Sequence, residues 1–135
     1  MSEGVRSLEE MRACYTADRF AIEAVGAQID SCGDGFAVCS LEIRPVHVNG
    51  HGMVMGGVSF TLADFAFAVA CDAMRTGAVT LSSSVQYLCA PKGRRLIAEA
   101  RRVREGRTAC FYAVTVHDDL GRHIAEVSIT GHKPG

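Results

Sequence analysis

An apolar stretch near the middle of the chain most limits how this protein can fold. From Gly56 or Gly57 to about Met74, apolar side chains occupy most directions around a helical axis, which predicts one helix of about five turns. Arg75 would place a cation beside its last turn, and Gly77 would supply a left-handed cap. A helix that is apolar nearly all round has to be covered by other elements on most sides.

Segments on both sides of this helix can provide that cover. Residues 7–16 predict a short helix, in which Ser7 and Glu10 form a capping box. Residues 24–31 and 36–43 predict two strands joined by a turn at CGDG, residues 32–35. After the long helix, turn signals separate four further predicted strands, at 79–89, 95–104, 107–117 and 122–132. Their short connections predict sequential, antiparallel strands.

This order of elements predicts a single α+β domain over residues 1–135. A six-stranded antiparallel sheet would wrap around the long central helix, with a short helix at the N-terminus, in the arrangement known as the hotdog fold. The net charge of −1 gives no reason to expect binding to nucleic acid or to an anionic membrane.

The sequence also bears on location and on metal binding. The polar, acidic N-terminal segment lacks the pattern of a signal peptide, so we expect a cytoplasmic protein. The apolar run from Val58 to Cys71 contains polar residues, and we expect it to be too short and too polar to span a membrane. The six cysteines are scattered singly, which predicts small buried hydrophobic side chains rather than disulfides or a zinc site. His47 and His51 are four residues apart, but Asn49 between them favours a loop, so we expect no metal.

One carboxylate, Asp64, lies within the apolar helix. An ionised carboxylate is costly to bury without a partner, so a buried acid is usually paired, protonated or functional. Asp64 could be structural, with a hydrogen bond to a backbone turn or to Thr80. It could instead be functional, as a base that activates water or as a nucleophile, and desolvation would make it a stronger base.

The residues around Asp64 resemble a known family. The segment NGHGMVMGGVSFTLADFAFAVACD, residues 49–72, is similar to the motif of the phenylacetate-degradation (PaaI-type) thioesterases, which are hotdog-fold acyl-CoA thioesterases. Residues 79–88 and 96–116 also fit the strand pattern of that family. The resemblance implies hydrolysis of an acyl-CoA thioester without metal or cofactor. It also implies a homodimer with a continuous sheet, often paired into a dimer of dimers.

The resemblance assigns roles to individual residues. It implies that Asp64 is the catalytic carboxylate and that the backbone amide of Gly56 polarises the thioester carbonyl. It also implies that Asn49 and Thr80 belong to the catalytic site. On this basis we favour a catalytic role for Asp64 over a structural one.

Two positions depart from the family pattern. Met55 occupies the place of a usual histidine, and Cys89 stands in a segment where an arginine-proline pair is more usual. The first departure supports an alternative reading, a non-catalytic acyl-CoA-binding protein with the same fold. A hydratase is disfavoured, because Val69 rather than a histidine follows five residues after Asp64.

Helix geometry adds an inference about assembly. The first amides of a helix have no intrahelical partner and carry the positive end of the dipole, so the Gly56 amide suits a developing oxyanion. The Gly-Gly pair could instead serve only close packing of the helix against the sheet. Eight residues of helix rise about 12 Å, so Gly56 and Asp64 of one chain cannot both contact one carbonyl carbon. A site that uses both would combine two subunits.

Further residues are candidates for substrate binding. Seven of the fourteen Lys and Arg residues lie between 92 and 107, and we expect Arg94 and Arg104 to bind the phosphates of CoA, although solvated strand faces are the alternative. Strand alternation would place Thr80, Ser82 and Ser84 on one face, where Ser82 could position water, and would place Arg102 on the face of Arg104.

The other candidates for substrate contacts are Met55, Gly57 and His51. For the acyl group, the resemblance suggests phenylacetyl-type or medium-chain esters. Four aromatic residues could line an acyl pocket or belong to the core: Phe60, Phe65, Phe67 and Tyr87.

Overall fold

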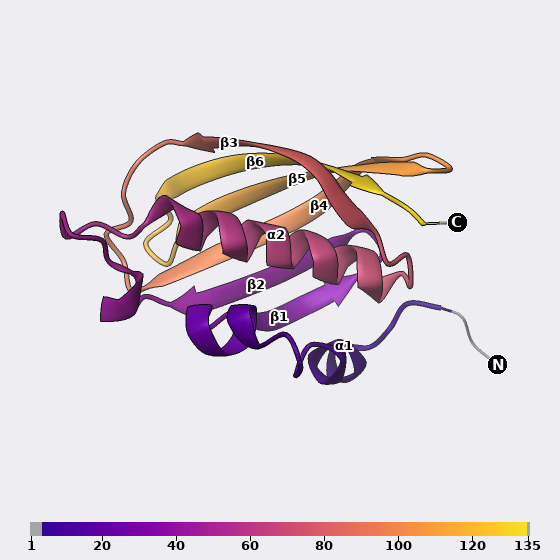
Figure 1. The fold of residues 1–135 in the computed structure, drawn as a ribbon, viewed down its shortest axis with the longest axis horizontal. Helices are drawn as coiled ribbons and strands as arrows, with labels where there is room; N and C mark the ends of the chain where they lie inside the picture. The colour runs from indigo at the N-terminus through magenta and orange to yellow at the C-terminus, as the bar shows by residue number, and fades with distance from the viewer. Residues whose placement is uncertain (1–3, 135) are drawn as a thin grey trace.

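The long apolar helix lies across one face of a curved six-stranded sheet. The computed structural model describes residues 4–134, and in it helix α2 runs from Gly56 to Ala73 (Figure 1). The strands are β1 (Gln28–Gly33), β2 (Phe36–Glu42), β3 (Val79–Tyr87), β4 (Arg95–Glu105), β5 (Ala109–Asp118) and β6 (His123–His132). Three short helices complete the fold: α1 (Leu8–Cys14), the π-helix η1 (Phe20–Val25) and the 3-10 helix η2 (Pro45–His47). The predicted α+β hotdog arrangement is confirmed.

The order of the strands in the sheet corrects one prediction. The order is β1-β2-β4-β5-β6-β3, and every neighbouring pair is antiparallel. The prediction of antiparallel pairing is confirmed, but β3 pairs with β6 rather than with β4, the next strand in the sequence. Helix α2 carries the chain across the sheet, so β3 forms the edge opposite β1, and β4 then fills the middle beside β2 (Figure 1).

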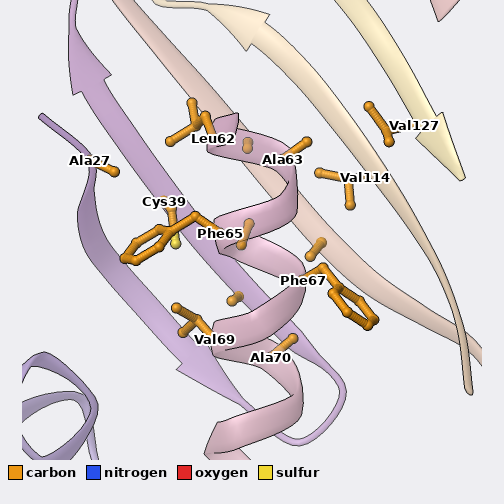
Figure 2. Packing of buried hydrophobic residues seen from close by; sticks show 14 of the residues in the cluster. Ala27, Cys39, Leu62, Ala63, Phe65, Phe67, Val69, Ala70, Val114 and Val127 are labelled. Carbon is orange, nitrogen blue, oxygen red and sulfur yellow. The ribbon is translucent and has the colours of Figure 1, made fainter. Parts of the chain in front are cut away.

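The core lies between α2 and the sheet. Phe65 extends to the side of the helix where Ala27 and Cys39 lie, and Phe67 extends to the other side, where Val114 lies (Figure 2). The ring of Phe67 also meets that of Tyr112 edge to face, with ring centroids 5.3 Å apart. Full burial of each such side chain contributes roughly 1.5–3 kcal/mol to stability. This packing explains why α2 is apolar in so many directions.

One face of α2 stays open. Gly57 is exposed, and Thr61, Asp64 and Ala68, which follow at helical spacing, are only half-buried. The expectation that Asp64 is buried in the core is therefore wrong, because it lies on the side of the helix that the sheet does not cover.

The same helix bears on the membrane prediction. At 18 residues and a mean hydropathy of 1.3, α2 is long and apolar enough to cross a bilayer by length and composition alone. Length and composition alone therefore do not exclude a membrane span for this helix. However, 56% of this stretch is buried inside the protein, as is common for the core helix of a globular domain.

The N-terminal region confirms one prediction and corrects another. The Ser7 hydroxyl accepts a hydrogen bond from the Glu10 amide at 3.1 Å, and the Glu10 carboxylate accepts one from the Ser7 amide at 2.9 Å, so the capping box is present. The strand predicted from residue 24 begins only at Gln28. The chain forms the π-helix η1 before it and reverses at Gly26, whose φ of 84° suits glycine.

The end of α2 also differs from the prediction. The chain leaves the helix at Arg75, which adopts a left-handed φ of 62°, and the Thr76 amide donates to the Cys71 carbonyl at 3.0 Å. Gly77 adopts a left-handed φ of 65° as well, but two residues later than the cap.

The cysteines only partly match the expectation of buried hydrophobic side chains. All six are free thiols, and three of them are buried: Cys39, Cys71 and Cys110. Burial raises the pKa of each of these three thiols. Cys14 is exposed, and Cys32 and Cys89 are half-buried.

A fully buried carboxylate, Asp118, organises the loops beside the sheet. It accepts hydrogen bonds from the amides of Lys92 and Gly93 and from those of Leu120 and Arg122, at 2.8–3.0 Å. Burial alone would raise the pKa of Asp118, but these amides stabilise the charged form and lower the pKa to about 2. The carboxylate thereby joins the β3–β4 connection to the β5–β6 turn.

Candidate functional site

The structure brings Asp64 and Thr80 together. The hydroxyl of Thr80, on the edge strand β3, donates a hydrogen bond to Oδ1 of Asp64 on α2 at 2.9 Å. The second carboxylate oxygen, Oδ2, has no hydrogen-bond partner among residues 4–134. Asp64 is thus oriented through one oxygen, and the other oxygen remains available to a substrate or a water molecule.

Ser82 lies on the other face of β3. The pairing of β3 with β6 shifts in register between Thr80 and Ser82, so the prediction that both share a face is wrong. Thr80 pairs with Gly131, which packs against Phe67 of α2, whereas Ser82 pairs with Thr130 on the outer face. Ser82 therefore faces away from Asp64.

The first turn of α2 carries free amides. Met55 is the N-cap residue, and its side chain caps nothing. A thioether cannot replace the Ser, Thr, Asp or Asn that usually accepts from these amides. The amides of Gly56 and Gly57 consequently have no acceptor among residues 4–134. They lie at the positive end of the helix dipole, where they can stabilise a negative oxygen.

The two glycines of the pair have different surroundings. The Tyr87 hydroxyl donates to the Gly56 carbonyl at 2.9 Å, and a Cβ placed on Gly56 would lie 2.9 Å from Cζ of Tyr87. Glycine at this position is thus explained by contacts within the chain. A Cβ on Gly57 would meet nothing within 4 Å, so no contact among the described residues requires glycine there.

Asn49 shapes the loop before α2. Its side-chain oxygen accepts hydrogen bonds from the amides of His51 at 2.9 Å and Met53 at 3.2 Å. This leaves the side-chain NH2 group free to donate to a ligand. The His51 side chain is exposed and does not line the cavity that Asn49 lines.

His47 is a buried residue of this loop whose position the sequence did not reveal. Its Nδ1 accepts from the Arg44 amide at 3.0 Å, and its Nε2 lies 2.7 Å from the Val25 carbonyl, so Nε2 carries the proton. Its own carbonyl accepts from the Met55 amide at 2.9 Å. His47 therefore joins η1 to the residue that starts α2, and both of its ring nitrogens are already engaged.

A cavity of about 400 Å³ opens beside the start of α2. Residues of the loop, the helix start and the β3–β4 connection line it, among them Asn49, Gly56, Tyr87, Cys89 and Pro91. The exposed Lys92 and Arg94 follow directly after this lining. The cavity thus includes Gly56, whose amide is free, and two exposed basic residues follow its lining in the sequence.

The two arginines predicted to bind CoA lie far apart. Arg94 precedes β4 and Arg104 lies near its other end, about 33 Å away along the strand. The pairing of β4 with β5 also shifts in register between Arg102 and Arg104. Arg102 pairs with the buried Tyr112 and Arg104 pairs with Phe111, so Arg102 and Arg104 lie on opposite faces of the sheet. The prediction that Arg102 and Arg104 share a face is wrong, and Arg104 does not reach the 400 Å³ cavity.

A smaller hollow, of about 150 Å³, lies directly beside Asp64. It is lined from α2 by Thr61, Asp64, Phe65 and Ala68, and from the segment around η1 by Asp18, Phe20 and Ala21. Of the four aromatic residues considered for an acyl pocket, Phe65 and Phe67 are core residues, Phe60 is half-buried and Tyr87 is exposed. Phe20, which the sequence did not suggest, is the exposed aromatic residue of this hollow.

The fold and the site define a hotdog protein with a carboxylate on the open face of its central helix and free amides at the start of that helix. Residues 51–125 match the Thioesterase superfamily, and the chain belongs to this family. The acyl-coenzyme A thioesterase PaaI of Escherichia coli is 29% identical over 131 residues, which covers 96% of this chain and 93% of PaaI.

Solved structures agree with this assignment. The structure of E. coli PaaI superposes with a TM-score of 0.82 at 26% identity, and covers 96% of this chain and 97% of that chain. A hypothetical thioesterase from Streptococcus pneumoniae, solved with coenzyme A, has a TM-score of 0.76 at 29% identity, and covers 81% of this chain and 89% of that chain. The protein is a PaaI-type enzyme of the acyl-CoA thioesterase class.

Two variants of the S. pneumoniae thioesterase bear on the site. Their structures carry alanine in place of an aspartate and of a threonine, and these positions are as far apart in that chain as Asp64 and Thr80 are here, 16 residues.

Proposed function

We propose that this protein hydrolyses acyl-CoA thioesters with Asp64 as its catalytic carboxylate, in a site shared by two subunits. The observation that carries the proposal is the hydrogen bond from Thr80 to Oδ1 of Asp64 on the open face of α2. This bond orients the carboxylate and leaves Oδ2 free beside a hollow that could receive an acyl group.

Either of two routes would complete the reaction. As a base, Asp64 takes a proton from water while the water oxygen attacks the carbonyl carbon; the C–S bond then breaks, and the CoA thiolate takes up a proton. As a nucleophile, Oδ2 attacks the carbonyl carbon and displaces the CoA thiolate, and water hydrolyses the resulting anhydride. Both routes place a negative charge on the carbonyl oxygen, which a preorganised amide can stabilise.

The Gly56 amide of a second subunit is our candidate for that role. Gly56 and Asp64 lie on one helix, about 12 Å apart along its axis, so they cannot act on the same carbonyl carbon within one chain. Two antiparallel α2 helices related by a two-fold axis would bring each Gly56 near the partner's Asp64 and create two equal sites.

The surface of the single chain supports such a dimer. Strand β3 is a nine-residue edge strand with unpaired backbone groups, and it exposes Val79 and Leu81. A long, apolar edge strand is prone to pair with another strand. Beside it lies the open face of α2, with the unobstructed Gly57. We propose that both surfaces are covered by the second subunit, and that pairs of dimers form a tetramer.

The 400 Å³ cavity is our candidate for the binding of CoA. Asn49 and the Gly56 amide offer hydrogen-bond donors in its lining, and the exposed Lys92 and Arg94, which follow the lining residue Pro91, offer positive charge for phosphates. Arg104 is too distant to join them on the same chain. We propose phenylacetyl-type or medium-chain acyl groups and a cytoplasmic location.

Replacement of Asp64 by asparagine tests the catalytic role. Asp64→Asn keeps an oxygen that can accept from Thr80, but it removes the base and nucleophile, so we expect kcat/KM for phenylacetyl-CoA to fall by about 10³-fold or more. The matched control is Asp30→Asn, on the exposed side of β1. Thiol release should be measured for both, with circular dichroism and sedimentation to show that fold and assembly are unchanged. A folded Asp64→Asn variant with wild-type turnover would refute the proposal.

A further inference from the structure

Phe20 is an exposed aromatic residue that lines the same hollow as Asp64. Its side chain is 65% exposed, and it lines the 150 Å³ hollow. The π-helix that begins with Phe20 is anchored behind it, because Ala21 and Val25 are buried. The Ala21 carbonyl accepts from the Ala27 amide at 2.8 Å, and the Val25 carbonyl accepts from His47 at 2.7 Å. The backbone of this segment is therefore anchored to the rest of the fold, and the segment forms one wall of the hollow.

The form of this segment also points to function. The π-helix is a rare conformation, and single π-turns within helices are frequent at functional sites. The side chain of Phe20 contributes little to the core, since most of its surface faces solvent. Single exposed hydrophobic residues are common, but this one faces a cavity that contains the candidate catalytic carboxylate.

The size and charge of the hollow restrict what it can hold. A cavity of about 150 Å³ can hold one benzene ring. Phe20 and Phe65 contribute aromatic surface to it. Asp18 lies at its rim, and no residue of the described chain forms an ion pair with it. With Asp64 on the other wall, two carboxylates border the space, so a third negative charge would be repelled.

We propose that Phe20 and Asp18 determine the acyl specificity of this enzyme. Phe20 favours an acyl group that ends in a single aromatic ring over a flexible chain, because a fixed aromatic wall contacts a ring edge to face or by offset stacking. Asp18 disfavours acyl groups that end in a carboxylate. This inference rests on the proposed function, because it requires the acyl group to lie beside Asp64.

Specificity ratios provide the test. The kcat/KM of phenylacetyl-CoA, hexanoyl-CoA and glutaryl-CoA should be measured by thiol release for the wild type, Phe20→Ala, Phe20→Leu and Asp18→Asn. Loss of the ring contact in Phe20→Ala should lower the ratio of phenylacetyl- to hexanoyl-CoA by about fivefold to tenfold, and Phe20→Leu should lower it less. Asp18→Asn should raise the kcat/KM of glutaryl-CoA by about fivefold, and by less at high salt.

Two matched variants control for general effects. Phe36→Ala removes a phenylalanine that is 42% exposed on β2, and Asp30→Asn removes an exposed charge on β1; neither residue lines the hollow. Both should leave the ratios unchanged within about twofold. If Phe20→Ala and Asp18→Asn change the ratios no more than these controls, the specificity proposal is wrong.

The Asp64→Asn variant separates this outcome from failure of the proposed function. An enzyme that depends on Asp64 but shows unchanged ratios in the Phe20 and Asp18 variants refutes only the specificity roles. Turnover that does not depend on Asp64 refutes the proposed function, and the specificity proposal with it.

Discussion

Replacing Gly57 by alanine should stabilise the chain and impair the enzyme. Gly57 is the second residue of α2, is not in a left-handed conformation, and has nothing within 4 Å of the place where a Cβ would lie. Alanine restricts the unfolded chain and suits a helix, which should raise the free energy of unfolding by roughly 0.4–1 kcal/mol. For a domain of this size the melting temperature should rise by about 2–5 °C.

The proposed dimer predicts the opposite effect on activity. If the bound thioester approaches the first turn of α2 closely, the added methyl group occupies space that the substrate needs. We expect kcat/KM for phenylacetyl-CoA to fall about tenfold or more, as binding geometry is sensitive to displacements of about 1 Å. Thermal melting and thiol release on the same preparation would measure both effects.

Gly56→Ala provides the contrast. Its Cβ would lie 2.9 Å from Cζ of Tyr87, so the end of that side chain must shift, which offsets the gain expected from alanine and should leave the stability close to wild type. A Gly57→Ala enzyme that is more stable and fully active would show that neither substrate nor partner occupies the space above Gly57, and the proposed assembly over α2 would be wrong.

Three other variants test separate parts of the structure. Thr80→Val removes the hydrogen bond to Asp64, so kcat/KM in the thiol-release assay should fall about tenfold, with Thr80→Ser close to wild type; equal activity of the valine variant would count against orientation by Thr80. In Asp118→Asn, the four amides no longer donate to a charged carboxylate. The free energy of unfolding measured with urea at pH 7 should therefore be lower by about 2 kcal/mol. Because the folded pKa of Asp118 is lowered to about 2, this difference should be full above about pH 4 and shrink as the pH falls toward 2; a difference that is independent of pH would contradict the charged role. Ser7→Ala removes the cap of α1 and should lower the free energy of unfolding by about 1 kcal/mol, whereas no change would mean that water replaces the cap.

Local patterns in the sequence predict the helices well. The capping box at Ser7 and the apolar run of α2 depend on interactions within one or two turns, and both are confirmed. The π-helix η1 was missed, because its apolar and small residues also fit a strand until Gly26 reverses the chain. The cap at Arg75 was missed because glycine is the usual residue in that conformation.

The sheet is harder to predict, because its order depends on contacts distant in sequence. The β3–β4 connection looks like a hairpin, yet β3 pairs with β6. Register shifts beside Ser82 and Arg104 reverse the alternation of side chains, and the sequence carries no clear signal for them. Both residues were therefore assigned to the wrong face.

The candidate site likewise combines a local motif, which the sequence reveals, with contacts between distant residues, which it does not. The motif around Asp64 can be recognised from sequence, but the contact between Asp64 and Thr80 joins a helix to an edge strand 16 residues later. The roles of His47 and Asp118 in holding loops were also missed. The sequence predicts a turn between the last two strands, but the four amide partners of Asp118 come from two separate loops.

In the sequence, Met55 in place of the usual histidine supports a non-catalytic acyl-CoA-binding protein, but the structure shows a different consequence of this residue. Its side chain does not cap α2, so the amides of Gly56 and Gly57 remain unpaired among residues 4–134. The absence of the usual histidine therefore leaves in place the group that would stabilise an oxyanion, the backbone amide.

Mixing two inactive variants tests the shared site most directly. Gly56→Pro deletes the amide; proline suits the first position of a helix, Met55 before it is already extended, and only the far end of the Tyr87 side chain must move. Asp64→Asn removes the carboxylate. Each variant alone should be folded and inactive. After subunit exchange in equal amounts, half of the dimers contain one subunit of each kind, and each of these has one intact site, so about a quarter of wild-type activity should return. A mixture as inactive as its two components would contradict a site built from the Asp64 of one subunit and the Gly56 amide of the other.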